Sequence, residues 1–201
     1  MSHDKHQEFY DELAQEWDYW YTAVDLEYLT YIIDGLEVQE GWDLLDIGCG
    51  TGILFDLLRR RVGDKGTVTG VDFSIQMALK AHRNFPFPNV NVVDGDVNML
   101  PFRDNTFDMG MSVRSFDDFP DKAKALSEVR RVLKPGSAFV ILHLYSSKEL
   151  SEVHHEMGGA VYDDIMPTKD EMQQLLQDGG FSDIVVEDQP GHYLAMATVK
   201  K

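Results

Sequence analysis

The chain contains a single cysteine, Cys49, among its 201 residues. One thiol cannot form an intramolecular disulfide, and chemistry that needs several thiolates, such as binding a metalloid, is disfavoured. No apolar run approaches the roughly 20 residues that cross a bilayer, and the first six residues are polar, without the apolar region of a signal peptide. These absences predict a cytoplasmic protein with no membrane span.

Basic residues are also scarce, since 18 Lys and Arg stand against 35 Asp and Glu, for a formal net charge of −17. A surface of this sign repels phosphate backbones and anionic membranes, so we expect no nucleic-acid partner. The same charge also has a simpler explanation, which is that it aids solubility. The length predicts one domain over residues 1–201, and the chain shows no repeat or linker.

Glycine is present where it is most informative. Residues 44–52 read Leu-Leu-Asp-Ile-Gly-Cys-Gly-Thr-Gly, an apolar strand that runs into Gly48, Gly50 and Gly52, with Asp46 two residues ahead of the first glycine. Glycines are needed where the backbone turns tightly and a ligand approaches it closely. A strand, a glycine turn and a helix start form a nucleotide cradle. Dinucleotide dehydrogenases use G-x-G-x-x-G, whereas the third glycine here comes one position early. A purely structural turn is the alternative.

The hydrophobic pattern alternates strands with helices, which predicts an α/β fold with a mostly parallel sheet covered on both faces. Strands are expected at residues 42–47, 67–71, 90–93, 107–111 and 138–144, and helices at 51–61, 74–84, 121–133 and 168–178. Two further strands near 184–187 and 193–199 are joined by Pro190-Gly191, which favours a terminal hairpin. A dehydrogenase domain is not expected to end in this way.

Acidic residues end two of these strands. Asp72 lies 20 residues after Gly52, where a carboxylate can accept hydrogen bonds from both ribose hydroxyls of an adenosine. The alternative is that Asp72 caps the next helix, but Ser74 is the better N-cap. Asp96 and Val97 follow the third strand.

Four segments occur in a familiar order: Asp-x-Gly-x-Gly-x-Gly at 46–52, the acid at 72, the run 100–108, and Leu-Lys-Pro-Gly at 133–136. Together they resemble the class I S-adenosylmethionine (SAM) dependent methyltransferases over residues 9–199, and most closely the ubiquinone/menaquinone-biosynthesis type. Ser137 stands where that family normally has a second glycine. The resemblance implies a Rossmann-like, doubly wound, mostly parallel seven-stranded sheet with a terminal antiparallel hairpin. It also implies methyl transfer from SAM to a small-molecule acceptor, releasing S-adenosylhomocysteine, by a monomer or homodimer.

The resemblance further implies a set of cofactor residues. The glycines and Asp46 would hold the methionine part, Asp72 the ribose, and Asp96 with Val97 the adenine edge. The full set is Tyr10, Tyr21, Asp46, Gly48, Gly50, Gly52, Asp72, Phe73, Met77, Asp96, Val97 and Ser112. Of these, Phe73 and Met77 would pack on the adenine and the backbone of Ser112 would meet the ammonium. The rings of Tyr10 and Tyr21 would face the sulfonium or, alternatively, serve only as helix packing.

Two segments are expected near the carboxyl ends of the strands, where open α/β sheets bind ligands. One is an N-terminal helical lid, residues 1–40, with an aromatic helix at 9–21; the other is a substrate-side insertion, residues 145–167. Within the insertion, Ser146 and Glu149 have the spacing of a capping box, which predicts a short helix.

Three histidines are the candidate catalytic residues. His143 ends the fifth strand and suits a general base near neutral pH. His154 and His155 fall near the end of the insertion's helix, where they would act on the substrate or simply favour the helix dipole. A metal site formed by these histidines with Asp163 or Asp164 is a further alternative, although no metal-type spacing is present and we expect none.

Arg114 follows the fourth strand, where it would bind an anionic substrate group or, more simply, pair with Asp117 or Asp118 at the surface. Two other functions stay open at this point. One is an NAD-binding oxidoreductase, against which the glycine spacing and the terminal hairpin argue. The other is a SAM-binding regulatory or partner-dependent module without activity of its own.

Overall fold

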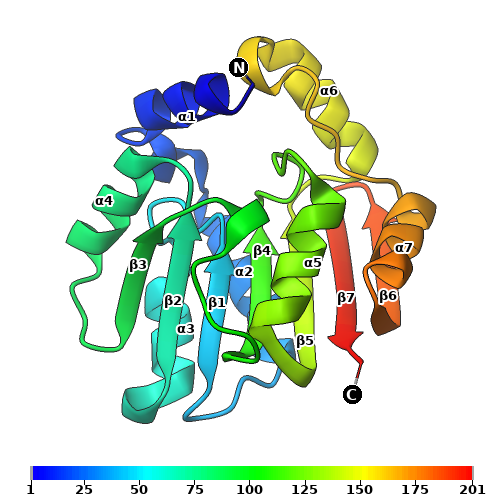
Figure 1. Ribbon diagram of the computed structural model, residues 1–201. Helices are drawn as coiled ribbons and strands as arrows, with labels where there is room; N and C mark the ends of the chain where they lie inside the picture. The colour runs from blue at the N-terminus through cyan, green and yellow to red at the C-terminus, as the bar shows by residue number, and fades with distance from the viewer. Residues whose placement is uncertain (1, 201) are drawn as a thin grey trace.

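The computed structural model describes residues 2–200, with side chains from Lys5 onward, and its centre is one seven-stranded sheet (Figure 1). The strand order is β3-β2-β1-β4-β5-β7-β6. The first five strands run parallel, and β7 is antiparallel to both β5 and β6. The strand order reverses between β1 and β4, and this switch point is where such sheets bind ligands.

The strands are β1 (Asp43–Ile47), β2 (Thr67–Asp72), β3 (Val90–Asp94), β4 (Phe107–Val113), β5 (Leu133–His143), β6 (Phe181–Gln189) and β7 (His192–Val199). The α-helices are α1 (Ser2–Leu13), α2 (Ala23–Gly35), α3 (Phe55–Val62), α4 (Ile75–Asn84), α5 (Lys122–Val132), α6 (Ser147–Met157) and α7 (Lys169–Asp178). Short 3₁₀ turns follow at η1 (Trp17–Trp20), η2 (Gly63–Lys65), η3 (Val97–Met99) and η4 (Gly159–Val161).

Apolar side chains fill both faces of the sheet. On one face, Leu126 and Val129 of α5 pack in a cluster with Phe139 of β5. On the other, Leu29 of α2 and Leu58 of α3 belong to a second cluster. In Figure 1 the helix α5 lies in front of the sheet, and α2 and α3 lie behind it. The buried strands are apolar on both sides because helices cover both faces.

The fold predicted from the sequence is confirmed, including the terminal antiparallel hairpin. The helix expected at 51–61 begins only at Phe55, because the glycine loop continues in turns up to Leu54. The strand expected at 138–144 begins earlier, at Leu133, and pairs with β4 from there. The capping box of α6 forms as expected, with Ser146 at the N-cap and Glu149 reaching back to it.

Residues 1–40 do not behave as one element. The helix α1 and the turn η1 lie over the carboxyl ends of the strands, as Figure 1 shows. By contrast, Leu29 and Ile33 of α2 are each 1% exposed and belong to the core. The part of this segment that can form a lid is therefore the part ahead of α2.

Candidate functional site

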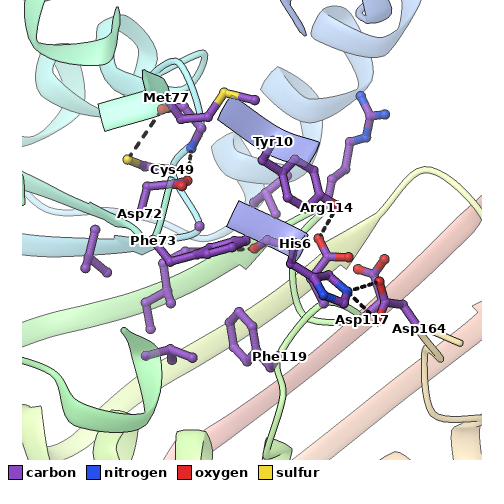
Figure 2. Close-up of a pocket in the computed structure, with 18 of the residues that line it drawn as sticks. His6, Tyr10, Cys49, Asp72, Phe73, Met77, Arg114, Asp117, Phe119 and Asp164 are labelled. Atoms are coloured by element: carbon purple, nitrogen blue, oxygen red, sulfur yellow. Dashed lines mark hydrogen bonds and ion pairs between the residues drawn. The ribbon is translucent and has the colours of Figure 1, made fainter. Parts of the chain in front are cut away.

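A cavity of about 830 Å³ opens at the carboxyl ends of β1, β2 and β4. Its walls come from the glycine loop after β1, the loops after β2, β3 and β4, the helix α1 with η1, and the segment after α6. Figure 2 shows Asp72, Phe73 and Met77 on one side of this cavity and His6, Asp117 and Asp164 on the other. A single cavity thus joins two ends with different chemistry.

The glycine loop forms the floor between these ends. Gly48 has φ +70°, and a Cβ built there would lie 2.4 Å from Ser115 Oγ. Gly50 has φ +54°, and its Cβ would meet Trp17 Nε1 at 3.2 Å. Both glycines line the cavity. Only glycine adopts these φ values at no steric cost while leaving the backbone open to a ligand.

Gly52 has a different place. Its φ is +83°, and an added Cβ would lie 2.7 Å from the ring of Phe55 and 2.9 Å from that of Phe85. It is not among the residues that line the cavity. Its visible role is to let the loop pass close to two aromatic rings on the side away from the cavity lining.

Asp72 connects the glycine loop to the start of α4. One carboxylate oxygen accepts a hydrogen bond from the Gly50 N–H at 2.7 Å, and the other accepts from the Ser74 N–H at 2.9 Å. Burial raises the pKa of Asp72 to about 6 against the effect of these two hydrogen bonds. The side chain also lines the cavity. Both expected functions of Asp72, facing a ligand and ordering the helix start, are compatible with this geometry.

Asp46 and Cys49 are buried beside the loop. Burial, followed by repulsion from Asp72, raises the pKa of Asp46 to about 7. Burial likewise raises the pKa of the Cys49 thiol well above its ordinary value, so the thiol is neutral at physiological pH. Cys49 is therefore a wall of the cavity and not a thiolate nucleophile.

Beyond β2 and β3, the cavity ends among apolar side chains. Phe73, Met77 and Val97 line it together with Asp96. Asp96 accepts a hydrogen bond from the Asn98 N–H at 2.8 Å, which fixes the turn η3. This end of the cavity thus combines apolar side chains with one carboxylate.

At the loop's other side, Arg114 adopts φ +57°, which is unusual for a residue with a side chain. Its guanidinium lies 4.4 Å from the ring centroid of Tyr21 and 5.9 Å from that of Trp17. Its Nε and Nη1 atoms are buried without a hydrogen-bond partner among the described residues. The ion pair expected with Asp117 or Asp118 does not form within that part of the chain, because the aromatic rings hold the guanidinium instead.

Tyr10 and Tyr21 both line the cavity. The Tyr10 hydroxyl donates to Asp118 at 2.6 Å, and its ring meets Phe73 edge-on with centroids 5.7 Å apart. Ser112 is different, because it is fully buried and not part of the lining. Its hydroxyl pairs at 2.7 Å with Ser115, which in turn donates to the carbonyl of Ile47 at 2.8 Å.

None of the three candidate catalytic histidines lines the cavity. His143 is 4% exposed, and burial lowers its pKa to about 4, so it is neutral at physiological pH. His154 is also buried; its Nδ1 donates to the carbonyl of Asp164 at 3.0 Å, and its Nε2 lies 3.4 Å from Asp117. His155 is exposed and packs against the ring of Tyr162.

Contacts between distant segments close the cavity above. His6 of α1 contacts the Asp164 carboxylate at 2.8 Å, across 158 positions of sequence. Asp11 accepts from the Ser74 hydroxyl at 2.6 Å and so holds α1 to the start of α4. Lys80 of α4 forms an ion pair with Asp18 at 2.8 Å. The segment from α1 to η1 is thus fastened on both sides of the cavity.

Several lining residues were not singled out by sequence reasoning. They are Lys5, His6, Trp17, Ile47, Ile53, Leu54, Val71, Gly95, Val113, Ser115, Phe119, Pro120, Lys122 and residues 159–160 and 165. The loop after β4 carries a usable signal, since residues that follow a parallel strand lie at the ligand edge. Nothing local marks His6, because its partner is remote in sequence.

Among the residues whose side chains are described, no three His, Cys, Asp or Glu residues are grouped closely enough to hold a metal ion. Within the same part of the chain, no helix has the length and apolar character needed to span a membrane.

The chain is similar to known proteins of one family. The model of a family described as "Methyltransferase domain" matches residues 45–141. The demethylmenaquinone methyltransferase of Staphylococcus aureus strain JH9 is 31% identical, over 82% of this chain and 78% of that protein. Its counterpart in Staphylococcus epidermidis strain ATCC 12228 is 29% identical, over 93% of this chain and 89% of that protein. The chain belongs to the class I SAM-dependent methyltransferases.

The methyltransferase's fold agrees with a solved relative. A SAM-dependent methyltransferase from Thermotoga maritima superposes with a TM-score of 0.75 at 20% identity, covering 95% of this chain and 98% of that one. The protein is a transferase that uses SAM and acts on a small-molecule acceptor. These matches give no support to the NAD-binding alternative.

Proposed function

We propose that the cavity holds SAM at the end formed by the glycine loop, β2 and β3, and holds the methyl acceptor at the end formed by the loop after β4 and the segment after α6. The observation that carries this proposal is the continuity of the two ends in one cavity of about 830 Å³. A shared space lets the two reactants meet in line, and positioning supplies much of the catalysis of such a transfer.

The cofactor roles follow the geometry. Gly48 and Gly50 offer open backbone to the methionine part, with Asp46 beside them. Asp72 faces the ribose, and its two backbone hydrogen bonds pre-orient it. Phe73, Met77, Asp96 and Val97 form the adenine slot. Gly52 and Ser112 support the loop and the end of β4 without lining the cavity.

Arg114 was expected from the sequence to bind an anionic substrate group or to pair with Asp117 or Asp118, and we propose a related role at the cofactor. Its guanidinium lies beside Tyr21, at the methionine end of the cavity, and two of its nitrogen atoms have no hydrogen-bond partner among the described residues. A carboxylate is the natural partner of a guanidinium held in this way. We therefore assign Arg114 to the carboxylate of the methionine part, and Tyr10 and Tyr21 to the aromatic wall.

SAM, when bound, supplies an electrophilic methyl group on a sulfonium. The contribution of this chain is to exclude water through α1, η1 and the segment after α6, and to hold the acceptor in line. Among the three histidines, His154 alone contacts a carboxylate that lines the cavity, Asp117. We propose it as a positioning residue. His143 and His155 have no contact with the cavity that supports their acting as a base.

The relatives' name makes a demethylated menaquinone one acceptor to test. The relatives are identical to this chain at about three positions in ten, which does not carry their substrate over. We further propose a cytoplasmic monomer or homodimer that acts on no nucleic acid, in keeping with its net charge of −17. Cell fractionation, size-exclusion chromatography with light scattering, and a nucleic-acid binding assay test these three points.

The first experiment is ligand stabilisation followed by turnover. S-adenosylhomocysteine at 100 times its dissociation constant should stabilise the protein by about 2.7 kcal/mol, and NAD at the same concentration should not. Methyl-labelled SAM should then label a small molecule in an extract of the source cells. Stabilisation by NAD alone would contradict the proposal. Binding of S-adenosylhomocysteine without labelling of any extract component would favour the regulatory module.

A further inference from the structure

Four carboxyl groups line the acceptor end of the cavity: Asp117 and Asp118 from the loop after β4, and Asp163 and Asp164 from the segment after α6. Figure 2 shows Asp117 and Asp164 beside His6, on the side away from Asp72 and Met77. These acids therefore face the acceptor and lie apart from the adenine slot.

The partners of these acids are unevenly distributed. The Asp164 carboxylate lies 2.8 Å from His6 Nε2. One oxygen of Asp118 accepts a hydrogen bond from the Tyr10 hydroxyl at 2.6 Å. One oxygen of Asp117 lies 3.4 Å from His154. The other oxygen of Asp117 is buried and has no hydrogen-bond partner among the described residues. The other oxygen of Asp118 is likewise buried without a donor, and the Asp118 carboxyl lies within hydrogen-bond reach of the Asp164 carboxyl.

Lys122, the neighbouring cation, does not donate to the side-chain oxygens of Asp117 or Asp118 that lack a hydrogen-bond donor. Lys122 also lines the cavity, but its ammonium donates to the backbone carbonyls of Asp117 at 2.8 Å and Phe119 at 3.2 Å. Arg114 is held by Tyr21 and forms no ion pair with either acid within the described part of the chain. Among the described lining residues, His6 already contacts Asp164, and Lys5 is exposed.

Asp117 is the decisive residue because it is only 3% exposed. A buried carboxylate oxygen without a donor is costly, since it has lost water and gained nothing in return. Burial and the charge of Asp117 both raise the pKa of Asp118 well above its ordinary value. A ligand that brings positive charge and N–H donors would relieve the desolvation and the repulsion together.

The remaining walls suit the same ligand. Phe119 and Tyr10 belong to the same lining, and the Tyr10 hydroxyl contacts Asp118. Aromatic faces attract organic cations and pack against their carbon atoms. A neutral alcohol could donate one hydrogen bond but would leave the charge unbalanced, and an anion would be repelled.

We propose that the methyl acceptor carries an ammonium group, which binds at Asp117 and Asp118. The inference rests on the proposed function, because it assigns the acceptor to this end of the cavity. It names the substrate class as organic amines, in contrast to the neutral quinone in the relatives' name.

The test uses three probes of one shape and different charge: benzylamine, benzyl alcohol and benzoate. Their dissociation constants are measured by titration calorimetry on the whole protein saturated with S-adenosylhomocysteine. Benzylamine should bind at least tenfold more tightly than benzyl alcohol, and benzoate should bind more weakly than either. Affinity for benzylamine that does not exceed that for benzyl alcohol would overturn the proposal.

Two isosteric variants locate the effect. D117N and D118N should each weaken benzylamine binding about tenfold, in the range expected for one charged hydrogen bond, and should leave benzyl alcohol binding within about twofold. D64N removes the same charge from an exposed site outside the cavity and should change neither. An equal loss in D64N, or no loss in both cavity variants, would reject Asp117 and Asp118 as the binding groups.

Binding of S-adenosylhomocysteine distinguishes a failure of the ammonium proposal from a failure of the proposed function. If it binds wild-type protein and both cavity variants equally while benzylamine does not bind, the ammonium proposal fails and the cofactor site stands. If it does not bind wild-type protein, the proposed function fails and the inference falls with it. Tighter binding of 1,4-naphthoquinone than of benzylamine would replace the amine with the relatives' acceptor class.

Discussion

The Asp72 carboxylate accepts a hydrogen bond from the Gly50 N–H at 2.7 Å. The same side chain accepts from the Ser74 N–H at the start of α4. One residue therefore sets the shape of the glycine loop and also faces the cavity. A substitution at this position must be interpreted for both roles.

We expect D72A to lower stability as well as cofactor affinity. Each buried N–H that loses its acceptor costs about 1–3 kcal/mol, which corresponds to several degrees in Tm for a chain of this size. D72N should keep one acceptor, recover part of the lost Tm, and still bind S-adenosylhomocysteine at least tenfold more weakly. Thermal unfolding and calorimetry measure the two effects. Full affinity in D72N would remove Asp72 from the ribose site.

Gly48 offers a second test because the chain supplies its own control. G48A combines φ +70° with a Cβ 2.4 Å from Ser115 Oγ. Gly158 has the similar φ of +64°, but nothing lies within 4 Å of its Cβ. Gly158 also has ψ −159°, a backbone region that is essentially restricted to glycine. G158A should thus cost about 1–3 kcal/mol from backbone strain alone, whereas G48A should cost clearly more and abolish S-adenosylhomocysteine binding. Equal Tm losses in the two variants would show that Ser115 yields freely.

Cofactor affinity should depend on pH through Asp46. Burial and Asp72 raise the pKa of Asp46 to about 7, so this carboxyl is substantially protonated just below neutrality. A cationic amino group of the ligand favours the ionised form, which means that binding releases a proton. The dissociation constant of S-adenosylhomocysteine should therefore rise as pH falls from 7.5 to 6, by up to about tenfold per pH unit.

Proton release provides the direct measurement. Calorimetry in two buffers of different ionisation enthalpy should detect the released proton in wild-type protein, and D46N should release less. Asp72, whose pKa burial raises to about 6, adds a second group at lower pH. A dissociation constant that is constant from pH 6 to 7.5 would contradict the placement of Asp46 beside the ligand's ammonium.

His143 should contribute to acid sensitivity. Its folded-state pKa is about 4, below the ordinary 6.5, because burial disfavours the charged ring. The unfolded chain therefore binds the extra proton between these values, and stability that is present above pH 6.5 is lost as pH falls towards 4. The gap corresponds to roughly 3 kcal/mol.

The comparison variant is H143Q, which cannot take up this proton. Denaturant unfolding from pH 7 to 4.5 should show wild-type stability falling more steeply than that of H143Q. Turnover at pH 7 provides a second readout, since a catalytic base predicts a large drop in kcat without a matching change in cofactor affinity. Parallel stability curves would show that His143 is not held neutral in the folded state.

The sequence predicted the sheet and much of the cavity floor because both depend on local signals. The run before Gly48 and the acid at Asp72 mark strand ends, and parallel strands bring their ends to one edge. Gly52 shows the limit of this reasoning, since the spacing of the glycines does not reveal that it faces Phe55 instead of the cavity.

The side of the cavity formed by α1, η1 and the segment after α6, here called its roof, could not be predicted in the same way. The contact between His6 and Asp164 joins two residues 158 positions apart, and no local sequence pattern around either residue predicts this pairing. Arg114 is a similar case, because its nearest acids in sequence are Asp117 and Asp118 while its actual neighbour in space is Tyr21. Such pairings depend on how separate loops fold over the sheet.

The antiparallel course of β7 has a practical consequence for handling the protein. Because β7 runs antiparallel to β5, its last residue, Val199, lies at the end of the strands opposite the cavity. The helix α1 lies over the cavity itself (Figure 1). An affinity tag fused behind β7 will leave ligand entry unobstructed. One fused ahead of α1 will crowd His6 and the cavity roof, so assays of acceptor binding belong on carboxyl-terminally tagged protein.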